Sequence, residues 1–234
     1  MNSAPVAPLP FHPSLRAVRW RRLWLGIMLM GLSLSYVVTK TLPVSVGWEN
    51  GWLEDAQVVV LLTGALTALC FAFAGTSGSA VEREAKGLAM ALAPVWFLLA
   101  ARELSWGAVL LPPVGFSEDG PIYSSALLWY KPAVYPAAAL VLAGCAWVFA
   151  RYRADRMVLR LVRSSQFVWA ELVVLLLAGA LSTYAEGHLG VPVASALEGR
   201  TLVMEEWAEM FAYIALVAAQ WHAFALVRSV LPPR

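Results

Sequence analysis

The chain has 234 residues, of which 60% are hydrophobic and 14% charged, and its formal net charge is +2. Soluble domains carry about 25% charged residues, so this composition leaves too little polar surface to cover a water-soluble fold. It excludes a single soluble domain, and the small net charge gives no sign of a nucleic-acid partner.

Six apolar segments approach or reach the roughly 20 residues that a helix needs to cross a bilayer. In chain order they cover residues 23–39, 56–73, 88–101, 133–150, 167–184 and 207–227. The connecting loops are short and leave no room for a separate soluble domain. The sequence therefore predicts an all-α, polytopic transmembrane bundle of six helices. The chain is expected to consist of an N-terminal tail (1–22), one membrane domain (23–228) and a C-terminal tail (229–234).

The distribution of lysine and arginine predicts the orientation of these spans, because cytoplasmic loops carry an excess of both residues. One predicted side holds Arg16, Arg19, Arg21, Arg22, Arg83, Lys86, the five arginines between 151 and 163, Arg228 and Arg234. The other side holds Lys40, Arg102, Lys131 and Arg200. Both termini are therefore expected in the cytoplasm. Short loops and arginine-rich turns favour a bacterial inner membrane.

The loop at residues 151–163 alternates its arginines with Met157, Val158, Leu159, Leu161 and Val162. This pattern predicts a basic amphipathic segment at the inner membrane surface, where anionic lipids would attract it. Membrane lipids are therefore expected partners.

Acidic residues gather at the predicted outer ends of the spans in four segments. They are Trp52-Leu53-Glu54-Asp55, Arg102-Glu103-Leu104-Ser105-Trp106-Gly107, Glu186-Gly187-His188 and Glu205-Glu206-Trp207-Ala208-Glu209. The predicted topology brings all four to a similar depth. Ionisable groups at membrane depth cost several kcal/mol unless they are paired or hydrated, so they usually face the bundle interior or a wet cavity. We expect a shared acidic cavity that faces the periplasm.

Glu103, Glu206 and Glu209 are the expected catalytic residues of this cavity. Neighbouring carboxylates with different environments can divide the roles of acid and base in hydrolysis. Arg102 would hold an anionic headgroup through its planar guanidinium. Because Arg102 and Glu103 point about 100° apart on a helix, we expect each to reach a partner on another span.

Asp55, Glu186 and His188 are the candidate metal ligands. Carboxylate oxygens and imidazole nitrogens bind divalent cations. The cofactor is left open by the sequence, and a divalent metal is the candidate.

Two further patterns concern contacts between spans. Helical spacing places Glu205, Glu209, Tyr213 and Gln220 on one face, which predicts that this face turns inward. Glu171 and His222 lie at similar predicted depth on consecutive antiparallel spans, where their contact would lock the helices or serve a proton step.

The R-E-L-S-W-G segment at 102–107, the E-D pair at 54–55 and the E-E-x-x-E segment at 205–209 carry a resemblance. With them the chain resembles small multi-span bacterial inner-membrane proteins that carry an E-[IL]-S-W-G segment. This resemblance covers three short segments and implies no particular activity. It highlights Glu103, Glu206 and Glu209 again, and it adds Ser105 and Trp106 to Arg102 as expected substrate-binding positions. Membrane ceramidase-type hydrolases also hold a metal at helix ends, but this chain lacks their H-x-x-x-H pair.

These patterns favour a protein that processes or recognises a lipid-linked substrate. One alternative is an accessory or assembly subunit whose arginine–carboxylate network locks helices and whose outer loop binds a membrane-protein partner. The other is a cation-coupled small transporter that uses Glu103 and Glu171. The sequence has no convincing internal repeat, which counts against transport. It also has no H-E-x-x-H, P-loop or G-x-S-x-G motif.

Overall fold

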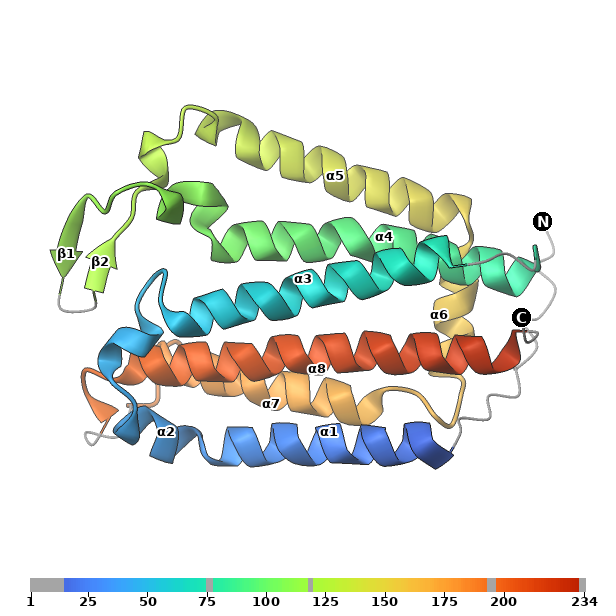
Figure 1. The fold of residues 1–234 in the computed structure, drawn as a ribbon, viewed down its shortest axis with the longest axis horizontal. Coiled ribbons are helices and arrows are strands. Elements are labelled where there is room, and N and C mark those ends of the chain that lie inside the picture. The colour runs from blue at the N-terminus through green and yellow to red at the C-terminus, as the bar shows by residue number, and fades with distance from the viewer. Residues whose placement is uncertain (1–14, 75–77, 118–119, 193–196, 232–234) are drawn as a thin grey trace.

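The computed structural model describes residues 15–74, 78–117, 120–192 and 197–231. The long helices run side by side, and consecutive ones are antiparallel (Figure 1). They are α1 (Leu15–Ser33) continued by α2 (Ser35–Thr41), α3 (Trp52–Phe73), α4 (Ala80–Glu103), α5 (Lys131–Arg151), α7 (Trp169–Ala185) and α8 (Thr201–Val230). The short α6 (Ala154–Val162) lies across their ends between α5 and α7.

Four of these helices, α3, α4, α5 and α8, are long and apolar enough to cross a membrane. A fifth span is obtained if α1 and α2 are counted together, although they are bent by 55°. The break falls at Leu34, inside the segment that the sequence predicts as one straight span. Helix α7 is apolar but has only 17 residues. The all-α fold is thus confirmed, with four to five helices that could span a membrane by length and composition, where the sequence predicts six.

Local sequence explains where the helices begin. Ser79 precedes α4, and its Oγ accepts a hydrogen bond from the backbone N–H of Glu82, which is the S-x-x-E pattern of a helix start. Helix α3 begins after Gly51 with Glu54 and Asp55 in its first turn, where the helix dipole favours negative charge. Helix α5 carries a proline in its first turn, where the missing N–H costs nothing.

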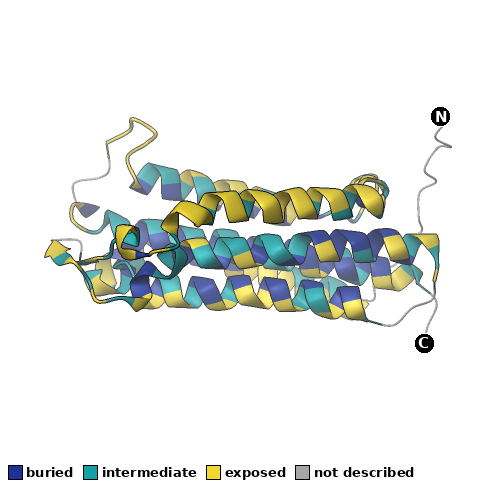
Figure 2. Cartoon of the chain, turned by 90° about the horizontal axis from the view of Figure 1, so that it is seen from above, coloured by how far each residue is buried: buried dark blue, intermediate teal, exposed yellow. Residues whose placement is uncertain are grey.

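Helix α8 is the centre of the bundle. It packs against α7, α3 and α1, and its first half also touches α2 and the 3₁₀ turn η1 (Val44–Gly47). One apolar core joins α3, α4, α6 and α8 around Leu61, Trp96 and Phe224, and a second joins α1, α7 and α8 around Met28 and Phe211. Helix α5 lies outside these cores. It packs mainly on α4, has no buried residue, and is drawn largely in the exposed colour in Figure 2.

Small residues allow the helices to approach closely, which is the usual device in membrane bundles. A Cβ at Gly31 would lie 2.0 Å from the Phe211 ring, so the lack of a side chain there lets α1 and α8 approach closely. A Cβ at Gly64 would lie 2.7 Å from the Trp96 ring. At Gly179, by contrast, a Cβ would meet nothing within 4 Å, so this glycine does not mark a close approach between helices.

A buried polar network crosses the middle of the bundle. Trp96 Nε1 of α4 donates to Gln220 Oε1 of α8 at 2.6 Å. Gln220 Nε2 donates in turn to Gly64 O and Thr67 Oγ1 of α3, both at 2.9 Å. Every heavy polar atom of the Gln220 amide is therefore paired, and the network ties three helices together in one register.

The chain between α4 and α5 is not helical throughout. It contains the 3₁₀ turn η2 (Ser105–Leu110), an antiparallel pair of strands and the 3₁₀ turn η3 (Ser125–Leu127). The strands are β1 (Gly115–Ser117) and β2 (Gly120–Ile122), in the register Gly115 to Ile122 and Ser117 to Gly120. Residues 118–119, which connect the two strands, lie outside the described residues.

Candidate functional site

The two ends of the bundle differ in charge. We call the end where α3 and α8 begin the acidic end, and the end where α1, α4 and α7 begin the basic end. The acidic end carries Glu49, Glu54, Asp55, Glu103, Glu186, Glu198, Glu205, Glu206 and Glu209, with Lys40, Arg102, Lys131 and Arg200 as its basic residues. All other described lysines and arginines lie at the basic end.

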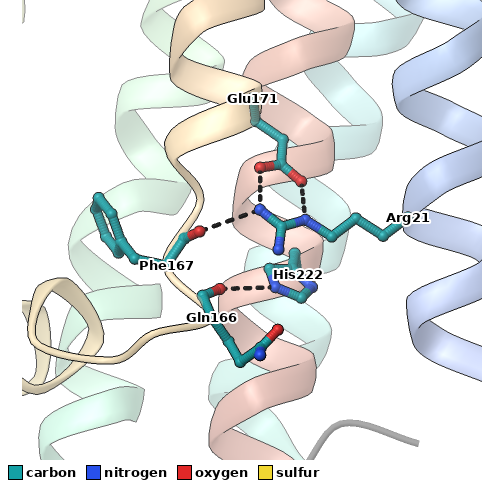
Figure 3. Close-up of polar contacts among 5 residues, drawn as sticks. All are labelled: Arg21, Gln166, Phe167, Glu171 and His222. Carbon is teal, nitrogen blue, oxygen red and sulfur yellow. Dashed lines mark hydrogen bonds and ion pairs between the residues drawn. The ribbon is translucent and has the colours of Figure 1, made fainter. Parts of the chain in front are cut away.

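Each buried carboxylate at the basic end has a basic partner. Glu171 of α7 is 1% exposed and receives two hydrogen bonds of 2.7 Å from Arg21 of α1, as Figure 3 shows. Arg21 also donates to the carbonyl of Phe167 at 3.1 Å. In the same region Arg160 pairs with Glu84, and Lys86 pairs with Glu82.

The predicted contact between Glu171 and His222 is replaced by this arrangement. Nε2 of His222 donates to the carbonyl of Gln166 at 3.0 Å, while Arg21 occupies both oxygens of Glu171 (Figure 3). The sequence-based expectation overlooked α1 as the source of the partner. A bidentate guanidinium matches a carboxylate better than one imidazole nitrogen.

The buried carboxylates at the acidic end contact neutral groups instead. Glu103 and Glu206 are both 8% exposed. Tyr213 OH of α8 donates to Glu103 Oε1 at 2.7 Å, and Gln57 Nε2 of α3 donates to Glu206 Oε2 at 2.8 Å. Gln57 is fully buried, and its Oε1 has no hydrogen-bond partner among the described residues. The hydrogen-bond partners of these two buried carboxylates are therefore neutral side chains.

Arg102 is the basic residue nearest to these groups. Its Nε lies 3.9 Å from Glu103 Oε1, at the limit of an ion pair, and its side chain is 59% exposed. Glu103 does reach another helix, as expected, through Tyr213. Arg102 remains at the surface of the acidic end, where it adds positive charge beside Glu103 and Glu209.

Three carboxylates form a compact group at the mouth of the acidic end. Glu186, which follows α7, and Glu205 and Glu209 of α8 each place an oxygen within 4.8 Å of the others. Ser182 Oγ donates to Glu209 at 3.4 Å, and His188 Nδ1 donates to Glu186 at 2.8 Å. We call Glu186, Glu205 and Glu209 the carboxylate triad.

The candidate metal ligands are thus only partly brought together. Glu186 belongs to the triad and His188 touches it through Glu186, whereas Asp55 is exposed on α3 and is not a member. Glu205 and Glu209 complete the triad with Glu186, because Glu205 lies one helical turn before Glu209 on the same face of α8. That spacing was visible in the sequence as a face of α8, but the choice of Glu205 over Glu206 depends on how α8 is rotated. Gln57 was missed because a single amide in an apolar span has no distinctive pattern.

The turn after α4 has an unusual backbone. Ser105, Trp106 and Gly107 have φ angles of 44°, 57° and 97°, which only glycine adopts without cost. Ser105 Oγ donates to Glu49 at 2.8 Å, and Tyr130 OH donates to the carbonyl of Trp106 at 2.9 Å. These bonds hold the strained turn in place.

Ser105 and Trp106 therefore lie at the acidic end but are not part of the carboxylate triad. Trp106 lines a small surface hollow together with Ser125, Leu128, Lys131, Val134 and Tyr135. The S-W-G part of the predicted substrate segment shapes a turn and an aromatic surface, while Glu103 at its start enters the bundle.

Replacing Gly107 with alanine is expected to destabilise the protein by about 1–3 kcal/mol, because a side chain is strained at this φ. The new Cβ would also lie 2.8 Å from Tyr130 OH. Unfolding in mixed micelles with increasing dodecyl sulfate would measure the loss. Gly199→Ala is the control, since φ there is 70° but no atom lies within 4 Å of a Cβ. If the two variants lost the same stability, the contact with Tyr130 would contribute nothing.

Comparison of the chain with models of protein families, with curated proteins and with solved structures gave no match. The site is therefore interpreted from its own geometry.

Proposed function

We propose that this chain is a six-span protein of a bacterial inner membrane, with both termini in the cytoplasm and the acidic end toward the periplasm. The positive-inside rule supports this orientation, because lysines and arginines concentrate at the basic end. Helix α7 has 17 residues, at the short limit of a spanning helix. Its flanking Trp169 is exposed and suits the membrane interface.

We further propose that the acidic end binds a divalent cation and uses it to recognise or process a lipid-linked substrate. The observation that carries this proposal is the difference in pairing between the two ends. Carboxylates at the basic end are matched by Arg21, Arg160 and Lys86, whereas those at the acidic end outnumber the nearby bases. Unpaired carboxylates at membrane depth are unfavourable, so a cation would relieve their repulsion.

The donor set of the triad fits a hard cation. Its ligands are all carboxylate oxygens, which suit Ca²⁺, Mg²⁺ or Mn²⁺ better than the nitrogen- and sulfur-preferring metals. Oxygens bound to Ca²⁺ lie about 2.3–2.6 Å from the ion, so two of them are at most about 5 Å apart. The three oxygens of the triad all lie within 4.8 Å of one another, which is compatible with that limit. A bound cation would supply positive charge to attract and orient an anionic headgroup.

The remaining residues have separate proposed roles. Arg102 would contact the anionic headgroup, because its side chain is exposed at the acidic end beside Glu103. Glu103 and Glu206 would hold or transfer a proton at their carboxylate oxygens, where Tyr213 and Gln57 fix their positions. Trp106 would contact the apolar part of the substrate at the surface of the acidic end.

Replacing Glu209 with glutamine is expected to weaken divalent cation binding at least about tenfold, because it removes one of three charged ligands. Isothermal titration of the purified protein with Ca²⁺ and Mn²⁺ would measure this. Glu198→Gln is the matched control, since Glu198 is exposed at the same end but is not in the triad. Wild-type protein that binds neither ion, or a control that loses as much affinity as Glu209→Gln, would contradict the cation site.

The same preparations test the lipid-directed part of the proposal. Mass spectrometry of extracts from wild-type protein is expected to find one class of phosphorylated or otherwise anionic lipid, depleted in the Arg102→Gln variant. Recovery of a stoichiometric protein partner with no enriched lipid would instead favour an accessory subunit and contradict this proposal.

A further inference from the structure

Helix α6 lies across the basic end instead of running along the bundle (Figure 1). It joins the end of α5 to the chain that leads into α7. Its buried residues are Ala154, Met157 and Leu161, which pack into the core formed with α3, α4 and α8. If the long helices cross a membrane, α6 lies near the plane of its surface.

The other sides of α6 are amphipathic. Leu159 and Val162 are 38% and 39% exposed. Arg156 and Arg163 are seven residues apart, which places them within about 20° of one another around the helix axis and about 100–120° from Met157. Apolar residues therefore lie between the buried side and the arginine side. Such a helix typically lies in a lipid interface with its arginines at the headgroups.

Positive charge exceeds negative charge in this segment. Arg153 contacts Asp155 at 3.3 Å, and Arg160 pairs with Glu84 of α4. Arg151 and Arg156 form no ion pair within the part of the chain that the structure describes. The segment thus presents an excess of guanidinium groups beside exposed apolar side chains.

We infer that α6, with Arg151 and Arg163 at its two ends, binds the headgroups of anionic phospholipids. Guanidinium groups pair with phosphate through two parallel hydrogen bonds. Leu159 and Val162 would contact the start of the acyl chains. This apolar contribution favours a lipid surface over a soluble acidic partner, which would leave both side chains in water. The inference is independent of the cation site at the opposite end.

The full-length protein can be tested by native mass spectrometry with added phosphatidylglycerol or phosphatidylcholine. Wild-type protein is expected to bind phosphatidylglycerol more tightly than phosphatidylcholine. Arg156→Gln should weaken phosphatidylglycerol binding about fivefold, the usual effect of one basic residue at an anionic surface. Phosphatidylcholine binding should not change.

Two controls make the result specific to α6. Arg156→Lys keeps the charge and should retain the preference for phosphatidylglycerol. Lys40→Gln removes an exposed positive charge at the acidic end and should leave the preference unchanged. Equal binding of both lipids to wild-type protein would overturn the inference. Loss of the preference in Lys40→Gln as large as that in Arg156→Gln would also overturn it.

Discussion

Replacing Arg21 with glutamine is expected to lower the free energy of unfolding by about 3–5 kcal/mol, because it leaves a buried carboxylate without its cation. Glu171 is 1% exposed and both of its oxygens accept hydrogen bonds from Arg21. The substitution also removes the bond from Arg21 to the carbonyl of Phe167. Unfolding in mixed micelles, followed by circular dichroism as dodecyl sulfate is increased, would measure the change.

The neighbouring residue provides a matched control. Arg22→Gln removes the same charge from the next, exposed position of α1 and should change stability by less than about 1 kcal/mol. The double variant with Arg21→Gln and Glu171→Gln should recover most of the lost stability, because two neutral amides replace the unpaired charge. An Arg21→Gln variant as stable as Arg22→Gln would show that this pair does not hold α1 to α7.

The second large effect is expected from Gly64→Ala, which should cost about 1–3 kcal/mol through overpacking. The added Cβ would lie 2.7 Å from Trp96 Cδ2. The indole ring cannot simply rotate away, because its Nε1 is bonded to Gln220, which is bonded in turn to Gly64 O and Thr67. Moving the ring therefore disturbs the contacts of three helices. The same unfolding measurement applies.

Gly144→Ala on α5 separates this effect from a general response to alanine. No atom lies within 4 Å of a Cβ at Gly144. Alanine is also the better helix former, so this variant should be at least as stable as the wild type. Equal losses at both positions would show that the close contact between Gly64 and Trp96 has no energetic consequence.

The sequence predicts those parts of the fold that depend on one helix at a time. Apolar runs locate the long helices, and the spacing of Tyr213 and Gln220 correctly predicts that this face of α8 turns inward. The separation of charge between the two ends also follows from the positions of lysine and arginine along the sequence. The break at Leu34 was not predicted, although Ser33 and Ser35 flank it and Ser33 Oγ donates to Leu29 O in the preceding turn.

Contacts between helices were less predictable, because they depend on rotation and on distant partners. Arg21 and Glu171 are 150 residues apart, and nothing in the sequence pairs one with the other. His222 was at the right depth but faces Gln166. In the candidate site, only Glu186 of the three predicted metal ligands belongs to the triad. Its other members are Glu209, which was expected to be catalytic, and Glu205, while Asp55 and His188 are not members.

The position of α8 at the centre of the bundle has a consequence for how the protein is made. It packs on α1, α3 and α7, all of which precede it in the chain. Arg200 before α8 donates to the carbonyls of Thr39 and Leu42, and Trp207 donates to the carbonyl of Gly31. Helices α1 and α7, which are inserted before α8, thus lack their main packing surface until α8 arrives. Assembly should be concerted and late, and chains stalled before α8 should be preferred substrates for membrane proteases.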